Sequence, residues 1–370
     1  MSFEKIKNKL GFGIMRLKMV DDKVDYDEFS KMIDMYMKAG FNYYDTAHGY
    51  IDGKSEIALR DCLVARYNRE DYVFANKISA WLFEKEEEVA PLFEKQLEIC
   101  GLDYFDFYLF HCMNHETYPK YKDCNVLNVI RDFKKQGKIN HIGMSFHDTP
   151  EYLDLILTEN PWIEFVQLQI NYLDYDDPAV QSKKCHEVAV KHGKKIIVME
   201  PVKGGYLANI PEKAAKIFEE VTSGSHASYA LRYAASLPNV YMVLSGMGTT
   251  EMMQDNINTF TNFKPFGEKE FEAADKAREV IREVRQVPCT KCNYCADVCP
   301  VKIPISGIFS AYNSVLAAKK TRAQAKEDLP DNAKTAAECI KCGECEKVCP
   351  QHINIRENLE KTVKTFKLNK

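Results

Sequence analysis

Eight of the 13 cysteines fall into two copies of one spacing pattern late in the sequence. Each copy has the form Cys-x2-Cys-x2-Cys-x3-Cys-Pro, and the second copy repeats the first after fifty residues. Three closely spaced thiolates ligate three corners of a [4Fe-4S] cluster, while the fourth cysteine, followed by proline, turns away and ligates the other cluster. The pattern therefore predicts two clusters, the first held by Cys289, Cys292, Cys295 and Cys349, and the second by Cys339, Cys342, Cys345 and Cys299.

Structural zinc is the alternative occupant of paired Cys-x2-Cys units. Zinc needs four thiolates and makes no use of a third regularly spaced cysteine followed by the Cys-Pro step, so the spacing favours iron-sulfur clusters. Because each copy ligates the other copy's cluster, we expect the segment to fold only with its metal. The remaining cysteines are scattered, and we expect them to be small buried hydrophobic residues: Cys62, Cys100, Cys112, Cys124 and Cys185.

Short β-rich runs alternate with amphipathic helical patterns through the first 260 or so residues, roughly two thirds of the chain. Near-continuous apolar strands separated by helices predict a parallel sheet, and eight such units predict a (β/α)8 TIM barrel. A doubly wound dinucleotide fold would need a third glycine after the first strand, but the run GFGIMR (11–16) has arginine there. The predicted strands are 10–14, 41–47, 72–78, 105–111, 139–146, 165–172, 195–202 and 240–246.

The pattern divides the chain into a barrel at residues 1–265, a charged connecting helix at 266–285 and a two-cluster domain at 286–370. Net charge is −4 and the basic residues are dispersed, which argues against a nucleic-acid partner. The sequence shows neither a signal peptide nor an apolar run long enough to span a membrane. We therefore expect a cytoplasmic protein, in which thiols stay reduced and available to metal.

Polar residues close several of the predicted barrel strands. Chemistry in such barrels sits at the C-terminal ends of the strands, so these residues are the candidates for a catalytic site. Asp45 closes the second strand and Tyr50 lies in the loop after it, while Lys77 and His111 close the third and fourth strands. Two further histidines near strand ends compete for an acid-base or substrate-binding role, namely His48 and His147.

At these positions the chain resembles the aldo-keto reductase family. The resemblance covers roughly residues 8–260 and implies an oxidoreductase that reduces a small-molecule carbonyl or an activated double bond. By position it implies a catalytic tetrad of Asp45, Tyr50, Lys77 and His111. The motifs that carry it are YYDTAHGYIDGKSE (43–56), ANKIS (75–79), LFH (109–111), VQ (166–167) and EPVKGG (200–205).

The implied tetrad makes physical sense. A carbonyl that accepts a hydride develops alkoxide charge and needs a proton donor at its oxygen, and a phenol with a pKa near 10 is a weak acid at neutral pH. We expect the ammonium of Lys77 to lower the pKa of Tyr50, because a nearby cation favours the phenolate. Asp45 would hold Lys77 in place, and His111 would orient the carbonyl or share the proton.

The resemblance also implies cofactor positions, with departures. Phe146 replaces a common asparagine, and Met199 replaces the tyrosine that many members stack on the nicotinamide. Between residues 245 and 256 there is no lysine or arginine to hold the 2′-phosphate of NADP, which leaves NADPH, NADH and flavin mononucleotide open. The positions expected to contact the cofactor are Ser145, Gln167 and Met199 at its ring, and Ser245, Gly246, Gly248 and Asn256 at its phosphates.

The cysteine-rich segment resembles the α-helical ferredoxin type, because a long helical stretch separates its two motifs. One hypothesis is a carbonyl reductase with two [4Fe-4S] clusters for electron transfer. A second is a flavin-containing protein that exchanges electrons with a partner ferredoxin and does not use NAD(P)H directly. A third makes the barrel a redox-sensing module without turnover.

Overall fold

The computed structural model describes residues 2–284, 286–317 and 319–368, so residue 285, the last of the predicted connecting helix, lies outside the described part. The chain forms two compact units, and the predicted boundaries after 265 and 285 stay predictions. The first unit comprises the described residues of Met1–Asp176, Gln181–Pro201 and Ala227–Gly267. The second comprises those of Asp177–Val180, Val202–His226 and Glu268–Lys370.

The first unit is a closed barrel of eight parallel strands, which confirms the predicted fold. The strands follow one another around the barrel in chain order, and β1 closes it by pairing with both β4 and β10. All eight predicted strands are present: β1 (Leu10–Gly13), β4 (Tyr43–Asp45), β5 (Val73–Ser79), β6 (Phe105–Met113), β7 (Ile139–Phe146), β8 (Phe165–Gln169), β9 (Lys195–Met199) and β10 (Val240–Gly246).

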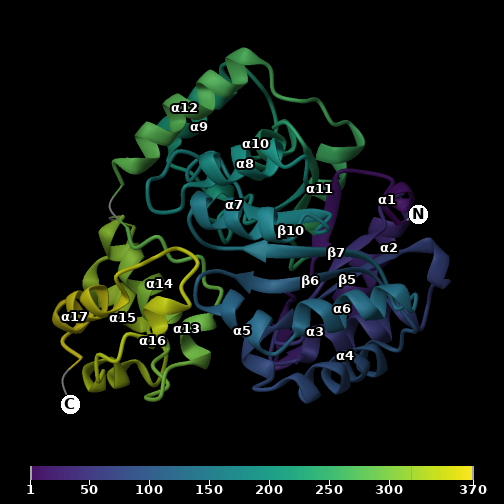
Figure 1. Cartoon of the computed structure of the whole chain (residues 1–370). Helices are drawn as coiled ribbons and strands as arrows, with labels where there is room; N and C mark the ends of the chain where they lie inside the picture. The colour runs from purple at the N-terminus through teal and green to yellow at the C-terminus, as the bar shows by residue number, and fades with distance from the viewer. Residues whose placement is uncertain (1, 285, 318, 369–370) are drawn as a thin grey trace. The chain divides into compact units, whose positions relative to one another are not determined.

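Helices surround the barrel strands (Figure 1), as expected for right-handed strand-helix-strand units. A small antiparallel hairpin of β2 (Met19–Val20) and β3 (Lys23–Val24) follows the first strand and was not predicted from the sequence. The helices of this unit are α1 (Ser2–Lys5), α2 (Tyr26–Lys38), α3 (Lys54–Leu59), α4 (Glu86–Cys100), α5 (Thr117–Asp123), α6 (Val126–Lys135), α7 (Pro150–Glu159), α8 (Ser182–Lys191), α10 (His226–Ala235) and α11 (Thr250–Thr261).

The barrel interior is filled with side chains. Every residue of β5 and of β6 is buried. At Gly143 a Cβ atom would lie 2.4 Å from the ring of Phe165, so glycine makes room for that ring. Because the centre is packed, chemistry is confined to the end of the barrel. The interior cluster consists of Tyr43, Val73, Ala75, Phe107, Leu109, Phe165, Ile197, Met242 and Leu244.

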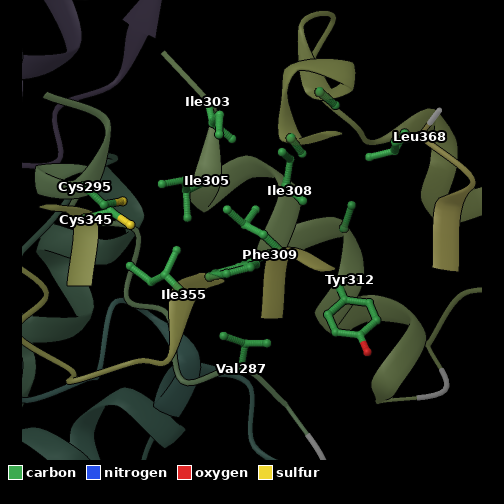
Figure 2. Close-up of a cluster of buried hydrophobic side chains, with 14 of the residues drawn as sticks. Val287, Cys295, Ile303, Ile305, Ile308, Phe309, Tyr312, Cys345, Ile355 and Leu368 are labelled. Carbon is green, nitrogen blue, oxygen red and sulfur yellow. The ribbon is translucent and has the colours of Figure 1, made fainter. Parts of the chain in front are cut away.

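The second unit is mainly helical and has its own apolar core, part of which is drawn in Figure 2. Ile305, Ile308, Phe309 and Tyr312 recur every three or four residues along one face of α14 and are buried there. The helices are α9 (Glu212–Glu219), α12 (Glu268–Arg282), α13 (Tyr294–Asp297), α14 (Ile305–Leu316), α15 (Arg322–Glu327), α16 (Glu344–Lys347) and α17 (Ile355–Phe366).

Among the described residues, none of the helices combines the length and the hydrophobicity that crossing a membrane requires.

Candidate active site and metal centres

The register of three neighbouring strands brings the predicted tetrad to one end of the barrel. Asp45, the last residue of β4, pairs with Ala75 of β5. Two residues further along β5 is Lys77, and Ser79 at the end of that strand pairs with His111 of β6. Parallel strands align their C-terminal ends, so these side chains share one mouth of the barrel.

Lys77 and Asp45 form a buried ion pair. The Lys77 ammonium donates to Asp45 Oδ1 at 2.5 Å and to the carbonyl of Thr46 at 2.8 Å. Gln167 donates to the other carboxylate oxygen at 3.2 Å. Burial alone has the largest single effect and would lower the pKa of Lys77, but the effects of Asp45 and Tyr50 together outweigh it, so the net pKa is raised. Lys77 is therefore a fixed, permanently charged ammonium at neutral pH.

Tyr50 lies beside this ammonium in the loop between β4 and α3. The Lys77 Nζ atom is 4.9 Å from the centre of the Tyr50 ring. Burial raises the pKa of Tyr50, and the opposing effect of Lys77 is smaller. The expectation that Lys77 brings this pKa below its ordinary value is therefore wrong. Desolvation of the phenolate raises the pKa by more than the ammonium of Lys77 lowers it. Tyr50 carries its proton at neutral pH.

His111 completes the set. Its Nδ1 atom is 2.7 Å from the hydroxyl of Ser79, and its ring centre is 5.9 Å from that of Tyr50. Burial lowers the pKa of His111 well below its ordinary value, and repulsion from Lys77 and His147 adds to the effect. The imidazole is therefore neutral and has one N–H to donate.

The two competing histidines have different surroundings. His48 Nδ1 is 2.6 Å from the buried carboxylate of Glu56, a hydrogen bond that raises the pKa of His48. Glu56 also accepts from Asn76 at 2.7 Å. His147 is near enough to His111 for their charges to interact. The structure thus engages His48 with Glu56 and brings His147 close to the tetrad.

Several predicted ring-side cofactor positions lie at the same mouth. The hydroxyl of Ser145 accepts from the backbone N–H of Cys112 at 2.8 Å, and Gln167 is bonded to Asp45 as described. Met199 is the last residue of β9 and is partly exposed. The side chains of Ser145 and Gln167 are thus held by hydrogen bonds within the protein, and the partly exposed thioether of Met199 lies at the end of β9.

The predicted phosphate-side positions lie where β10 leads into α11. Asn256 of α11 donates to the hydroxyl of Ser245 at 2.7 Å, which ties the helix to the strand. Thr249 caps α11 by accepting from the backbone N–H of Met252. Gly246 and Gly248 precede this cap, so backbone N–H groups at the start of a twelve-residue helix are close by.

Arg16 lies next to the segment 245–256, which has no lysine or arginine of its own. A Cβ atom on Gly246 would lie 3.3 Å from Arg16 Cδ, and one on Gly248 would lie 3.2 Å from the Arg16 carbonyl. The Arg16 guanidinium is 3.2 Å from a carboxylate oxygen of Glu200, the residue after β9. No sequence motif links Arg16 to these glycines, because only closure of the barrel between β1 and β10 brings them together.

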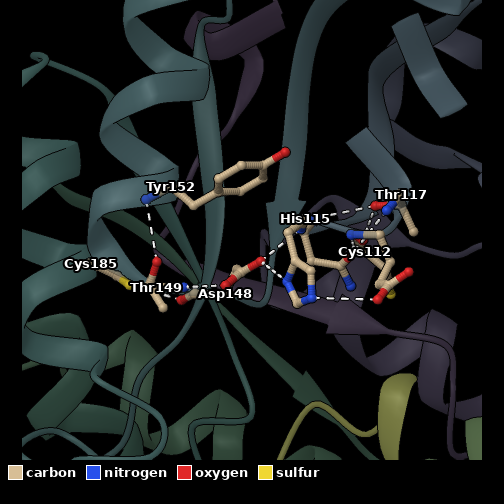
Figure 3. A network of polar contacts seen from close by, with 9 residues as sticks. Cys112, His115, Thr117, Asp148, Thr149, Tyr152 and Cys185 are labelled. Atoms are coloured by element: carbon tan, nitrogen blue, oxygen red, sulfur yellow. Dashed lines mark hydrogen bonds and ion pairs between the residues drawn. The ribbon is translucent and has the colours of Figure 1, made fainter. Parts of the chain in front are cut away.

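The rim beyond β6 and β7 is tied together by polar bonds, shown in Figure 3. Asp148 accepts from both the backbone N–H of His115 and its ring Nδ1, each at 2.7 Å. Cys112 has φ of 53° where the pairing of β6 with β7 shifts register. A bulge of this kind redirects the chain next to a site. Nearby, the ring of half-exposed Trp81 lies 5.2 Å from that of His111 at a tilt of 49°, which gives the mouth an aromatic wall that no sequence motif indicated.

Two cavities in the second unit are each lined by four cysteines. The first is lined by Cys289, Cys292, Cys295 and Cys349, and the second by Cys299, Cys339, Cys342 and Cys345. These are the two predicted sets, each with its fourth cysteine from the other motif.

Electrostatics groups the thiols in the same way. Burial raises the pKa of Cys295, and its strongest thiol neighbours are those of the first cavity. Burial raises the pKa of Cys345 to about 11, with further contributions from Glu346 and the thiols of the second cavity. Within the described parts of the chain, no three Cys, His, Asp or Glu side chains are arranged to hold a single metal ion. Two groups of four thiols, each completed by a cysteine of the other motif, fit [4Fe-4S] clusters, whose iron would offset the thiolate charges, better than zinc.

The two motif copies also share their backbone conformation. Lys291 and Lys341, each just before the second cysteine of its motif, both have φ of 60°. Asn293 and Gly343, each just after that cysteine, have φ of 66° and 84° and start a one-turn helix. The sequence repeat is therefore a structural repeat.

A closed (β/α)8 barrel with a buried ammonium, a phenol and a neutral imidazole at its C-terminal mouth defines a class of barrel oxidoreductase. The chain belongs to the aldo/keto reductase family, which it matches over residues 9–279. It also matches the 4Fe-4S dicluster domain over residues 288–354. Both resemblances expected from the sequence are confirmed, and the chain is an oxidoreductase.

The relatives agree with this assignment. The chain is 22% identical over 297 residues to the uncharacterized oxidoreductase YqkF of Bacillus subtilis, which covers 72% of this chain and 91% of that protein. It is 30% identical over 143 residues to an aldo-keto reductase of Gibberella moniliformis, which covers 36% of this chain and only 42% of that protein.

Solved structures show the same fold. The holo form of aldo-keto reductase AKR11C1 from Bacillus halodurans is similar with a TM-score of 0.60 at 22% identity, covering 73% of this chain and 91% of that one. An aldo-keto reductase from Klebsiella pneumoniae in complex with NADPH is similar with a TM-score of 0.60 at 16% identity, covering 72% and 90%.

Proposed function

We propose that this oxidoreductase reduces the carbonyl group, or an activated double bond, of a small molecule with NADP(H) or NAD(H), and that Tyr50 is the proton donor. The observation that carries the proposal is the buried Lys77–Asp45 pair, whose ammonium lies 4.9 Å from the ring centre of a protonated Tyr50 beside a neutral His111. These are an acid, its electrostatic support and a neutral hydrogen-bond donor at one mouth.

The protonation states of these residues fit carbonyl reduction. When a hydride adds to the carbonyl carbon, the oxygen becomes an alkoxide, which is a far stronger base than phenolate. The raised pKa of Tyr50 therefore keeps its proton available and does not prevent transfer. Lys77 stabilises the phenolate that forms, Asp45 keeps Lys77 charged and in place, and His111 donates a hydrogen bond to the reacting oxygen.

The proposed nicotinamide cofactor supplies the hydride when it is bound at this mouth. Ser145 and Gln167 would hold its carboxamide, with Met199 against its ring. Complex formation with NADPH by the Klebsiella relative supports this cofactor class, whereas flavin mononucleotide has no support from the relatives. The phosphates would lie on Ser245, Gly246, Gly248, Asn256 and Arg16.

We also propose that the two four-cysteine cavities hold one [4Fe-4S] cluster each, for one-electron exchange with a partner such as a ferredoxin. Of the eight ligand cysteines, the one that is exposed belongs to the second cavity. Its ligand Cys342 is exposed, and neighbouring Ile340 leaves 64% of its surface in solvent. Exposure of this kind allows close approach by a small redox protein.

Replacement of the Tyr50 hydroxyl tests the proposal. Tyr50→Phe should reduce kcat for NADPH-dependent reduction of aldehydes and ketones by at least about 100-fold, the usual contribution of general acid catalysis. NADPH affinity and iron content should not change. Tyr44→Phe is the matched control, because the Tyr44 hydroxyl is buried without a hydrogen-bond partner in the described structure. Full activity in Tyr50→Phe would refute the assignment.

A further inference from the structure

Lys203 is a buried residue that hydrogen-bonds to the lining of the first four-cysteine cavity. It follows the barrel strand β9 by four residues, but the segment 202–226 belongs to the second compact unit. Lys203 is only 5% exposed, and its ammonium donates to the side-chain oxygen of Gln351 at 3.0 Å. Gln351 follows the ligand Cys349 by two residues and lines the first cavity.

The backbone next to Lys203 is packed against the same cavity. Gly204 has φ of +61°, and a Cβ atom there would lie 2.5 Å from the carbonyl oxygen of Thr290. Thr290 follows the ligand Cys289 and lines the first cavity. Lys203 itself adopts φ of 48°, a conformation that costs a non-glycine residue energy. The segment is thus held tightly against both ligand loops of the first cavity.

The cation at the second cavity is in a different environment. Arg356 lines that cavity, but its side chain is 46% exposed and is 2.7 Å from the carboxylate of Glu346. A solvated cation has a weak field because water and salt screen it. A cation in a water-poor environment acts on a neighbouring charge with much less screening.

We propose that Lys203 sets the reduction potential of the first cluster and makes it the easier of the two to reduce. The proposal rests on the two-cluster assignment above. Each cluster gains one electron on reduction and so becomes more negative, and a buried cation favours the more negative state. An electron delivered by a partner at the exposed second cavity would then settle on the first cluster.

The test is a redox titration of the full-length, anaerobically purified protein, followed by electron paramagnetic resonance. Lys203→Met removes the charge and should make the first cluster at least tenfold harder to reduce, which is ~59 mV for one electron. Lys203→Arg keeps the charge and should retain the wild-type midpoint. Arg356→Met, the matched variant at the second cavity, should affect the other midpoint.

Gln351→Glu covers the case in which Lys203→Met loses iron. This nearly isosteric change retains an acceptor for Lys203 and adds a negative charge, so it should also lower the midpoint of the first cluster. Unchanged midpoints in the iron-replete Lys203→Met or Gln351→Glu protein would overturn the proposal, as would Lys203→Met and Arg356→Met affecting the same midpoint. Wild-type protein without two clusters' worth of iron and sulfide would instead refute the cluster assignment on which the proposal rests.

Discussion

Removal of the carboxylate from the Lys77–Asp45 pair should destabilise the barrel strongly. At the observed 2.5 Å separation, two unit charges attract by about 7 kcal/mol at an effective dielectric constant of about 20. Desolvation offsets part of this attraction. Asp45→Asn leaves the Lys77 ammonium buried without its counter-charge, and breaking such a pair costs about 3–5 kcal/mol. For a barrel of this size that lowers Tm by roughly 6–20 °C.

The double variant separates loss of the ion pair from other effects of the Asp45→Asn substitution. Asp45→Asn with Lys77→Met removes both charges, and replacing a buried ion pair by uncharged groups of similar volume is often neutral. The double variant should therefore recover most of the lost Tm. Asp132→Asn, which breaks an exposed pair with Lys135, is the control and should change stability by less than about 1 kcal/mol.

The assay is thermal unfolding of the anaerobically purified full-length proteins at one scan rate, followed by near-ultraviolet circular dichroism. If Asp45→Asn melts with the wild type, or if the double variant melts no higher than Asp45→Asn, the buried pair does not make the contribution assigned to it. Loss of activity in both variants together with the predicted Tm pattern would support a stabilising and a catalytic role for one pair.

Three further predictions follow from single contacts. Arg16→Met should raise the Kd for NADPH about tenfold or more in a fluorescence titration, since charge-assisted hydrogen bonds contribute about 1.5–3 kcal/mol; an unchanged Kd would place the phosphates elsewhere. Cys292→Ser should lose iron and sulfide, measured per chain, whereas buried Cys185→Ser should not; equal iron in both would refute the ligand assignment. Because Glu56 raises the pKa of His48 above 6.5, their stabilisation is complete below pH 6.5 and is lost as pH rises through the folded pKa. The Tm difference between wild type and His48→Gln should therefore shrink between pH 6 and 9, and a constant difference would contradict this.

The barrel and its mouth could be predicted because each signal is local. Strand runs such as 105–111 are mostly apolar and are bounded by helical patterns, which together indicate buried parallel strands. Once strands are placed, Asp45, Lys77 and His111 follow from their positions at strand ends. The cysteine spacing similarly predicts the two sets that line the cavities, because the exchanged fourth ligand follows from the Cys-Pro step.

The remaining features depend on long-range packing or on a balance of opposing terms. Arg16 reaches the glycines after β10 only because the barrel closes, and Lys203 meets Gln351 across 148 residues of sequence. No sequence motif indicates either contact. The prediction for the pKa of Tyr50 was wrong for another reason. The sequence indicates the cation of Lys77 but not how completely the phenol is desolvated, and desolvation has the larger effect on the pKa.

The two kinds of cofactor proposed for this protein transfer different numbers of electrons. A nicotinamide gives two electrons together as a hydride, whereas each [4Fe-4S] cluster accepts one. Carbonyl reduction at Tyr50 needs a hydride and a proton, and none of its steps calls for a single electron. The proposed clusters would therefore need a one-electron partner of their own, and we expect it to approach the exposed surface at Cys342 and Ile340. Two clusters together can hold the electron pair that corresponds to one hydride, and unequal potentials, set by Lys203, would fill them one after the other.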